Sequence, residues 1–232
     1  MNKKEGLTMK RSEINRILKE NMEFIKQMNF ALPPFAYFTP QEWKEKGEEY
    51  DEIRNNMLGW DITDYGRGDF EKVGLFLFTI RNGNFSDPHN KKTYAEKLLI
   101  SDEDQYSPMH FHFNKMEDII NRGGGNLIVE VYNCDENEGL ADTDVEVVTD
   151  GYRHTVPAGT KIRLTPGESI TLPPYQYHAF WAEKGYGKVL IGEVSMVNDD
   201  NNDNRFYEPQ ARFTTIEEDE EPLYLLCNEY KR

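Results

Sequence analysis

From about residue 55 onward the chain repeats one local pattern, and this pattern constrains its fold more than any other feature. Short runs of β-forming residues alternate with clusters of turn formers at nearly regular spacing. Many short strands separated by turns are typical of a β-sandwich or β-barrel. The expected strands are 74–80, 94–100, 109–113, 126–132, 145–148, 161–164, 169–172, 178–181, 188–196 and 223–227.

The N-terminal part has a helical pattern instead. Apolar residues at helical spacing predict an amphipathic helix over 12–29, which Ser12 is able to cap. Thr39 is followed by a proline and stands three residues before a glutamate, a combination that predicts the start of a second helix. This second helix is expected to end near Gly47, and residues 1–8 are expected to form a loose tail.

A single domain is expected, because no internal repeat or low-complexity linker divides the 232 residues. A chain of this length is able to bury a substantial core. In this interpretation residues 1–55 form a tail and helical extension, and this extension packs on a β-barrel formed by residues 56–232.

The charge and cysteine content exclude several classes of protein. The chain has 42 acidic and 27 basic residues and a formal net charge of −15, whereas nucleic-acid binding needs clustered basic residues. No apolar run approaches the roughly 20 residues that span a bilayer, and residues 1–10 lack a secretory signal core. Cys134 and Cys227 are isolated and form no metal-ligand pair or disulfide framework. We therefore expect a cytoplasmic protein that binds neither nucleic acid nor membranes. Most of the acidic excess lies in 130–150 and 199–229, which we interpret as mainly solvated surface.

Three of the five histidines form a pattern that predicts a metal site. His110 and His112 stand two residues apart, so an extended strand would direct both imidazoles to one face. Glu117 follows beyond an expected turn, and His178 lies in a later run. If these side chains face inward, three imidazole nitrogens and one carboxylate oxygen converge. Such a mixed set suits a divalent Mn, Fe, Co, Ni or Zn ion with positions left open for water or substrate.

Two segments resemble the two motifs of the cupin family. The first reads His-x-His-x4-Glu-x6-Gly from His110, and the second reads Gly-x5-Pro-x4-His and ends at His178. The chain departs from these motifs at Asp104 and Tyr175, where cupins usually have glycine. These departures concern turn geometry and not the metal ligands. The resemblance implies a mainly β fold, a cupin-type β-barrel (jelly roll), here with an N-terminal helical extension.

A longer resemblance covers nearly the whole chain. It is carried by Leu58-Gly-Trp-Asp, Tyr94-Ala-Glu-Lys, residues 117–125, Gly192-Glu-Val-Ser-Met-Val-Asn-Asp-Asp and Leu226-Cys-Asn-Glu-Tyr. These segments look like those of bacterial D-lyxose isomerases of the cupin type. The resemblance implies interconversion of D-lyxose and D-xylulose by a homodimer that uses a divalent metal, usually manganese. D-Mannose has the same configuration as D-lyxose at C2 and C3, so it is a second expected substrate.

Aldose–ketose isomerisation needs a proton-transferring group beside the C–H bond and stabilisation of the developing negative charge. The predicted metal site would serve the second need. Lys115 lies two residues before Glu117, so an extended backbone would direct it toward the metal. Glu193 interrupts the run 189–197, which is otherwise apolar on both faces, and a buried carboxylate costs free energy unless it is paired or used. We expect Lys115 and Glu193 to move protons on opposite sides of an enediol, and either could be the carbon base.

A sugar site also needs polar partners for hydroxyl groups and an apolar or aromatic wall. The candidates are Trp60, Asp61, Lys97, Tyr175, Asp199 and Arg205. Two other functions remain open at this point. One is a cupin oxygenase that uses the same ligands with iron, and the other is a sugar-binding cupin whose metal is structural.

Overall fold

The structure is a computed structural model that describes residues 7–230. Its elements are β1 (Thr8–Lys10), α1 (Arg11–Gln27), η1 (Pro34–Tyr37), α2 (Pro40–Lys44), η2 (Glu48–Tyr50), α3 (Asp51–Asn55), β2 (Gly59–Thr63), β3 (Leu75–Arg81), β4 (Tyr94–Ser101), β5 (Ser107–His112), β6 (Glu117–Gly124), β7 (Leu127–Cys134), β8 (Leu140–Ala141), β9 (Val145–Thr149), β10 (Tyr152–Val156), β11 (Thr160–Leu164), β12 (Ser169–Leu172), β13 (Gln176–Ala182), β14 (Val189–Met196), β15 (Asn204–Phe206) and β16 (Thr215–Glu217). None of the helices in the described part combines the length and the apolar character needed to cross a bilayer.

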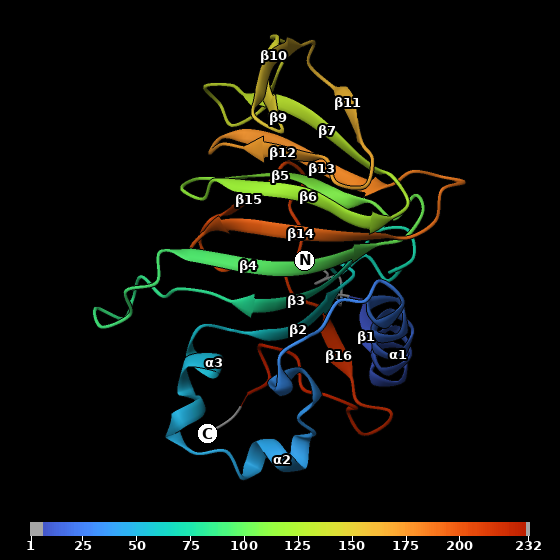
Figure 1. The fold of residues 1–232 in the computed structure, drawn as a ribbon, viewed down its shortest axis with the longest axis vertical. Helices are drawn as coiled ribbons and strands as arrows, with labels where there is room; N and C mark the ends of the chain where they lie inside the picture. The colour runs from blue at the N-terminus through green and yellow to red at the C-terminus, as the bar shows by residue number, and fades with distance from the viewer. Residues whose placement is uncertain (1–6, 231–232) are drawn as a thin grey trace, which may run out of the picture.

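Two curled β-sheets dominate the molecule (Figure 1). The larger has eight strands in the order β10-β9-β12-β6-β14-β4-β3-β2, and the smaller runs β11-β7-β13-β5-β15 with β8 beside β7. Inward-facing residues of both sheets form one apolar core, because alternate residues of a strand point to the same face. The mainly β, cupin-type fold predicted from the sequence is confirmed. This core includes Leu77, Leu99, Ile119, Val129, Phe180 and Ile191.

Helix α1 packs on the outer face of the eight-stranded sheet, where a second apolar cluster forms (Figure 1). Its buried residues include Ile14, Leu18 and Ile25, which recur at helical spacing as predicted. The prediction of Ser12 as its cap is wrong, because the helix begins at Arg11. The backbone N–H and the hydroxyl of Ser12 instead donate to the carboxylate of Asp219, at 2.9 and 2.7 Å. The C-terminal segment therefore caps the N-terminal helix.

The second predicted helix is confirmed as α2. The hydroxyl of Thr39 accepts a hydrogen bond from the backbone N–H of Glu42 at 3.2 Å, and the Glu42 carboxylate accepts one from the Thr39 backbone at 2.8 Å. These reciprocal bonds form the capping box that the sequence indicates. The helix ends at Lys44, before the expected Gly47.

Two local predictions at the chain ends are wrong. The run 223–227 is not a strand, although Leu226 forms one isolated bridge with Trp60. Thr8 is not part of a loose tail, because it begins β1 and pairs with Thr215 of β16. Residues 1–6 of that predicted tail lie outside the described residues. Both ends thus use backbone partners from the opposite end of the chain, which no local pattern predicts.

Sequence reasoning also missed several strands, including β2, β6, β10 and β15. Strand β6 is the important case for the site, because its inward residues begin with a glutamate and include a buried asparagine. Polar residues at inward positions disguise the alternation that predicts a strand. Strands β5 and β6 follow one another in the chain but lie in opposite sheets. The residues that end β5 and those that begin β6 therefore meet between the sheets.

Both departures from the cupin motifs fall where the backbone is left-handed. Asp104 has φ 59° and Tyr175 has φ 60°. Glycine adopts this conformation freely, whereas other residues adopt it at a cost of roughly 1–2 kcal/mol, which is smaller for aspartate. The interpretation of these positions as turn geometry is confirmed.

Candidate active site

Three histidines meet on the inner face of the smaller sheet. His110 and His112 lie on β5, and His178 lies on the neighbouring strand β13 directly opposite His110. One ring nitrogen from each histidine falls within 4.8 Å of the others. Strand alternation explains why His110 and His112 share a face, as the sequence predicts.

Hydrogen bonds orient these imidazoles so that ring nitrogens remain free. The Nδ1 of His110 lies 2.7 Å from the carbonyl of Pro108, and the Nδ1 of His178 lies 3.0 Å from that of Gln176. Both ring nitrogens of His112 and the Nε2 of His178 are buried and form no hydrogen bond, although both Nε2 atoms lie within 3.4 Å of the Glu117 carboxylate. Buried polar atoms normally have partners, and a Nδ1–H to carbonyl bond is the usual support of a metal-binding Nε2. This donor set therefore fits a divalent metal ion.

Electrostatics favours the neutral, metal-binding form of His110 and His112. Burial, together with the neighbouring His178 and His112, holds the pKa of His110 well below its usual value. Burial and the charge of Lys115 likewise lower the pKa of His112. A neutral imidazole has a free lone pair, so His110 and His112 need to release no proton before they bind a cation.

Glu117 faces the histidines from the opposite sheet, at the start of β6. Its Oε1 lies 3.1 Å from the Nε2 of His178 and 3.4 Å from that of His112. Burial opposes ionisation, but the charge of Lys115 and the contact with His112 hold the pKa of Glu117 well below its usual value. The ionised carboxylate could act as a fourth metal ligand beside the three imidazoles.

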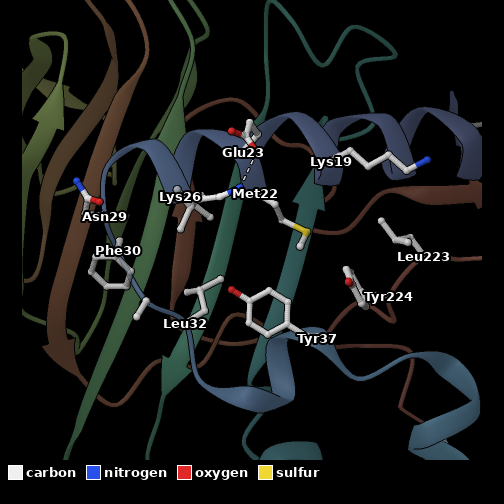
Figure 2. Close-up of a pocket in the computed structure, with 12 residues that line it drawn as sticks. Lys19, Met22, Glu23, Lys26, Asn29, Phe30, Leu32, Tyr37, Leu223 and Tyr224 are labelled. Atoms are coloured by element: carbon white, nitrogen blue, oxygen red, sulfur yellow. Dashed lines mark ion pairs between the residues drawn. The ribbon is translucent and has the colours of Figure 1, made fainter.

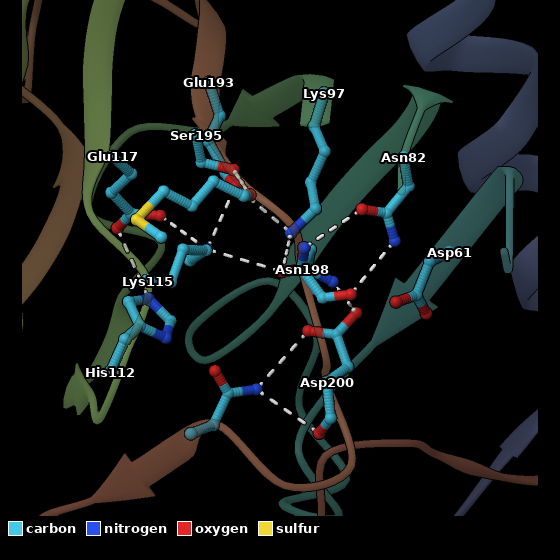
Figure 3. A network of polar contacts seen from close by, with 12 residues as sticks. Asp61, Asn82, Lys97, His112, Lys115, Glu117, Glu193, Ser195, Asn198 and Asp200 are labelled. Atoms are coloured by element: carbon cyan, nitrogen blue, oxygen red, sulfur yellow. Dashed lines mark hydrogen bonds and ion pairs between the residues drawn. The ribbon is translucent and has the colours of Figure 1, made fainter. Parts of the chain in front are cut away.

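Two lysines and a second glutamate extend this cluster (Figure 3). The Nζ of Lys115 lies 2.6 Å from Glu117 Oε2 and 3.0 Å from Glu193 Oε1. The Nζ of Lys97, on β4, lies 3.2 Å from the same oxygen of Glu193. Burial opposes protonation of Lys115, but the two carboxylates raise its pKa above the ordinary lysine value. The structure thus brings together Lys115, Glu193 and the predicted metal ligands.

A second ionic group, which sequence reasoning missed, closes the other side of the site. The Nη2 of Arg212 lies 2.7 Å from Asp61 Oδ2 and 3.1 Å from Asp200 Oδ2. Burial raises the pKa of Asp61, which the nearby Arg212 only partly offsets. For Asp200 burial is outweighed by the charges of Arg212, Lys97 and Lys115, which lower its pKa. One sequence observation could have indicated Arg212, which is one of two bases in the acidic segment 199–229.

Most of these groups, but not His178 or Asp61, line a small cavity of ≈ 40 Å³ between the two sheets. One side of the cavity is charged and the other is apolar or aromatic, which is the composition of a small-molecule site. Burial raises the pKa of Tyr65 on this wall to about 12, so its phenol stays neutral. The wall consists of Tyr65, Leu75, Leu77, Leu99, Ile119, Phe180 and Phe206, with Ser107 and Asn204 as further polar groups.

Of the residues predicted from the sequence to bind sugar, Lys97 lines this cavity and Asp61 contacts Arg212 beside it. The structure does not bring Trp60 to the site. Its ring is buried in the apolar cluster between α1 and the eight-stranded sheet, and its Nε1 donates to the carbonyl of Ala36. Tyr175 is 51% exposed and stacks on Phe111 outside the cavity.

Asp199 and Arg205 are also placed elsewhere, and these two predictions need correction. The carboxylate of Asp199 accepts hydrogen bonds from Asn201 and Asn202 and so closes a local turn. Arg205 pairs with Glu138 at 2.7 Å on the outside of the smaller sheet. The neighbouring Asp200 and the later Arg212 face the cavity in their place. A shift of one residue along an irregular segment decides which side chain faces inward.

A larger groove of ≈ 600 Å³ lies beneath α1 (Figure 2). Its walls are mainly apolar and include Met22, Leu32, Tyr37 and Tyr224. Glu23 and Lys26 form an exposed ion pair at its edge, at 3.9 Å. The residues that line it include no histidine or cysteine, in contrast to the cavity between the sheets.

Curated proteins are similar to this chain over almost its whole length. A curated D-lyxose/D-mannose isomerase of Serratia proteamaculans is 52% identical over 225 residues, covering 97% of this chain and 99% of that protein. A curated protein of the same description from Escherichia coli O157:H7 is also 52% identical, with the same coverage.

Solved structures share the fold at much lower identity. An L-ribose isomerase variant of Acinetobacter sp. DL28, in complex with L-ribose, matches with a TM-score of 0.61 and 14% identity, covering 90% of this chain and 98% of that chain. The L-ribose isomerase of Cellulomonas parahominis with L-ribose matches with a TM-score of 0.56 and 15% identity, covering 91% of this chain and 100% of that chain. The family model described as D-lyxose isomerase matches residues 9–230. With this match over almost its whole length and close relatives at 52% identity, the chain belongs to the D-lyxose isomerase family.

Proposed function

We propose that this protein is a metal-dependent aldose–ketose isomerase that interconverts D-lyxose with D-xylulose and D-mannose with D-fructose. One observation carries the proposal: the buried Glu193, held by two lysines, shares a cavity with the imidazoles of His110 and His112, which lie beside His178. This combination supports proton transfer by a carboxylate next to a site that suits a Lewis acid. The names of the two curated relatives support the choice of sugars.

In this proposal His110, His112, His178 and Glu117 would hold the metal ion. When bound, a divalent cation supplies Lewis-acid stabilisation of the negative charge that develops on the substrate oxygens. Three neutral nitrogens and one carboxylate oxygen form a donor set that suits Mn²⁺, which we propose as the native ion, and that also accepts Co²⁺, Fe²⁺, Ni²⁺ or Zn²⁺.

Glu193 is the proposed carbon base. A carboxylate has lone pairs to accept a proton, whereas an ammonium group has none. Lys115 contacts two carboxylates and so keeps its proton. Glu193 would remove the proton from C2 of the aldose and return it to C1 of the enediol, which gives the ketose. The proton on the C2 hydroxyl oxygen moves to the C1 oxygen in the same conversion, so the reaction consumes and releases nothing else.

The remaining polar groups of the cavity would orient the sugar. The ammonium groups of Lys97 and Lys115 are able to donate to substrate oxygens and stabilise negative charge there. Asp200, Arg212 and Asn204 line the same cavity and offer acceptors and donors for the other hydroxyl groups. The aromatic and aliphatic wall would exclude water from the reacting carbons.

Turnover of D-lyxose by Lys115→Ala and Glu193→Gln tests this proposal directly. Loss of a general acid–base group typically costs about 10²–10⁴-fold in rate, so each variant should lose activity on that scale. Bound metal should stay near the wild-type amount in Glu193→Gln, because Glu193 is not a proposed ligand. Glu96→Gln is the matched control, since Glu96 lies on the adjacent strand β4 and pairs with Arg81 on the outer face. Near-normal turnover in either test variant would remove that residue from the scheme.

The proposal further includes a cytoplasmic homodimer, as the family resemblance implies. Light scattering coupled to size-exclusion chromatography measures the mass of the particle. An oxygen-uptake assay beside the ketose assay separates the isomerase from the alternative oxygenase. Sugar binding without ketose formation would instead identify a non-catalytic binding protein.

A further inference from the structure

Asn198, which follows strand β14, is held in place by a second asparagine. The backbone N–H of Asn198 donates to Asn82 Oδ1 at 3.0 Å, and Asn82 Nδ2 donates to the Asn198 carbonyl at 2.9 Å (Figure 3). Asn82 is itself buried, 4% exposed. Both backbone groups of Asn198 are thus satisfied by one buried amide, which fixes the position from which the Asn198 side chain extends.

The side chain of Asn198 contacts three charged groups of the active site. Its Oδ1 accepts hydrogen bonds from Lys97 Nζ at 2.6 Å and from Lys115 Nζ at 3.4 Å. Its Nδ2 donates to Asp200 Oδ2 at 2.8 Å. An amide is well suited to this place, because it offers an acceptor to the cations and a donor to the anion.

The Asn198 amide is neutral, and this matters because both lysines also contact a carboxylate. Both ammonium groups also lie against Glu193 Oε1, at 3.2 Å for Lys97 and 3.0 Å for Lys115. The two cations therefore share one anionic oxygen and one neutral oxygen. An aspartate at position 198 would preserve the contacts with the lysines but would cancel one of their positive charges. It would also repel Asp200 in place of donating to it.

Asn198 contacts both lysines but does not line the cavity itself. It is absent from the residues that line the ≈ 40 Å³ cavity, whereas Lys97, Lys115 and Asp200 all line it. Asn198 instead lines an adjoining pocket of ≈ 330 Å³ together with Asn82 and Asp200. Any effect of Asn198 on the reaction must therefore pass through the charged side chains that it touches.

We propose that Asn198 is a positioning residue of the isomerisation. Its amide holds Lys97 and Lys115 side by side without neutralising them, and it orients Asp200 toward the cavity. Neither ammonium group then faces a further carboxylate at position 198, so both remain available to donate to the negative charge that develops on the sugar oxygens. This inference rests on the proposed function, because it assigns Asn198 a task only if the lysines serve the isomerisation.

The substitution Asn198→Asp separates this role from a structural one, since the two side chains have nearly the same shape. We expect kcat on D-lyxose to fall about 10²-fold, as for loss of a donor to a developing oxyanion, with KM within about threefold of wild type. Asn201→Asp adds the same charge at an exposed position of the same loop and should leave both constants unchanged. A kcat for Asn198→Asp within twofold of wild type, or a change confined to KM, would overturn the inference.

A second variant keeps the inference testable if Asn198→Asp does not fold. Asn198→Ala removes the shared acceptor without adding charge, so kcat should fall about tenfold, and a wild-type kcat would overturn the inference. Wild-type protein and Asn201→Asp must both convert D-lyxose in these assays. If neither does, the proposed function fails, which is a different result from an insensitive Asn198.

Discussion

At the scale of single residues, folding lowers the pKa of two histidines of the site, His110 and His112. In an unfolded chain their pKa is near 6.5, whereas burial and neighbouring cationic groups lower the pKa of His110 and His112 in the folded protein. Below pH 6.5 the unfolded chain therefore binds protons that the folded chain does not. Stability must fall as the pH drops from about 6.5 toward the lower folded values. Glu117 adds to this only below its own unfolded pKa, at more acidic pH.

Thermal unfolding of metal-free protein between pH 7.5 and 5.5 checks this residue-scale prediction. We expect the melting temperature to decrease with acidity through this window and the decrease to be shallower in His110→Gln. His89→Gln, at an exposed loop position, should behave like wild type. A His110→Gln variant with the same pH slope as wild type would contradict the assigned origin of the effect.

The residues that the sequence could predict are those whose spacing carries the information. His110 and His112 lie on one regular strand, so their separation of two residues fixes their common direction, while the spacing of the cupin motifs indicated Glu117 and His178. Asp200 and Arg212 lie on irregular backbone after β14, where spacing does not determine direction. Their place in the site depends on how the C-terminal segment crosses the barrel, which is a property of tertiary packing.

At the scale of elements, a carboxylate joins the loop after β5 to the loop before β15. Asp203 is buried, and its carboxylate accepts hydrogen bonds from the backbone N–H and side-chain amide of Asn114 and from the backbone N–H of Lys115, at 2.8, 2.9 and 3.0 Å. The turn that carries Lys115 is therefore fixed by a residue from the loop over the site.

Asp203→Ala should lower both stability and turnover. Leaving buried N–H groups without partners costs about 1–3 kcal/mol in the free energy of unfolding, and a displaced Lys115 should reduce kcat about tenfold. Asp135→Ala is the matched control, because Asp135 accepts two backbone hydrogen bonds in the distant turn 135–139. Urea unfolding and D-lyxose kinetics measure the two effects. Normal turnover in a destabilised Asp203→Ala would show that these hydrogen bonds stabilise the fold but do not position Lys115 for the reaction.

Strand prediction succeeded where a run is rich in apolar residues and failed where polar residues interrupt it. Strand β14 has apolar residues at most positions, so it was predicted with nearly its observed bounds although Glu193 and Ser195 point inward. Strand β6 places Glu117 and Asn121 inward, so its alternation is hidden. Buried polar groups on inward positions are the physical reason for this failure, since Asn121 donates to the carbonyls of Gly125 and Leu164 in place of packing in the core.

At the scale of the whole molecule, the acidic C-terminal segment is partly structural. The segment 217–221 packs against the start of α1, where Arg11 is 1% exposed and contacts Glu218 and Glu229. Asn15 donates to Glu220 and to the backbone of Glu221. The interpretation of this acidity as mainly solvated surface is therefore too simple. Carboxylates near a helix N-terminus also interact favourably with the helix dipole.

Replacement of Arg11 by alanine should destabilise the protein without changing its chemistry. Breaking a fully buried ion pair costs about 3–5 kcal/mol, but Glu218 and Glu229 are partly exposed, so we expect about 2 kcal/mol. Arg16→Ala, which breaks an exposed pair with Glu20 on the same helix, should cost less than about 0.5 kcal/mol. Denaturant unfolding compares the two variants. If Arg11→Ala were as stable as wild type, the contacts of Arg11 with the C-terminal segment would not stabilise the fold.

The central claim is that the cavity between the sheets performs metal-dependent aldose–ketose isomerisation. Its most direct test is to strip the purified protein of metal with a chelator, add back Mn²⁺, and follow conversion of D-lyxose to D-xylulose. We expect negligible ketose without metal and restored turnover with Mn²⁺, and no restoration in His110→Gln. Equal turnover with and without chelator, or no ketose with any of the divalent ions considered, would contradict it.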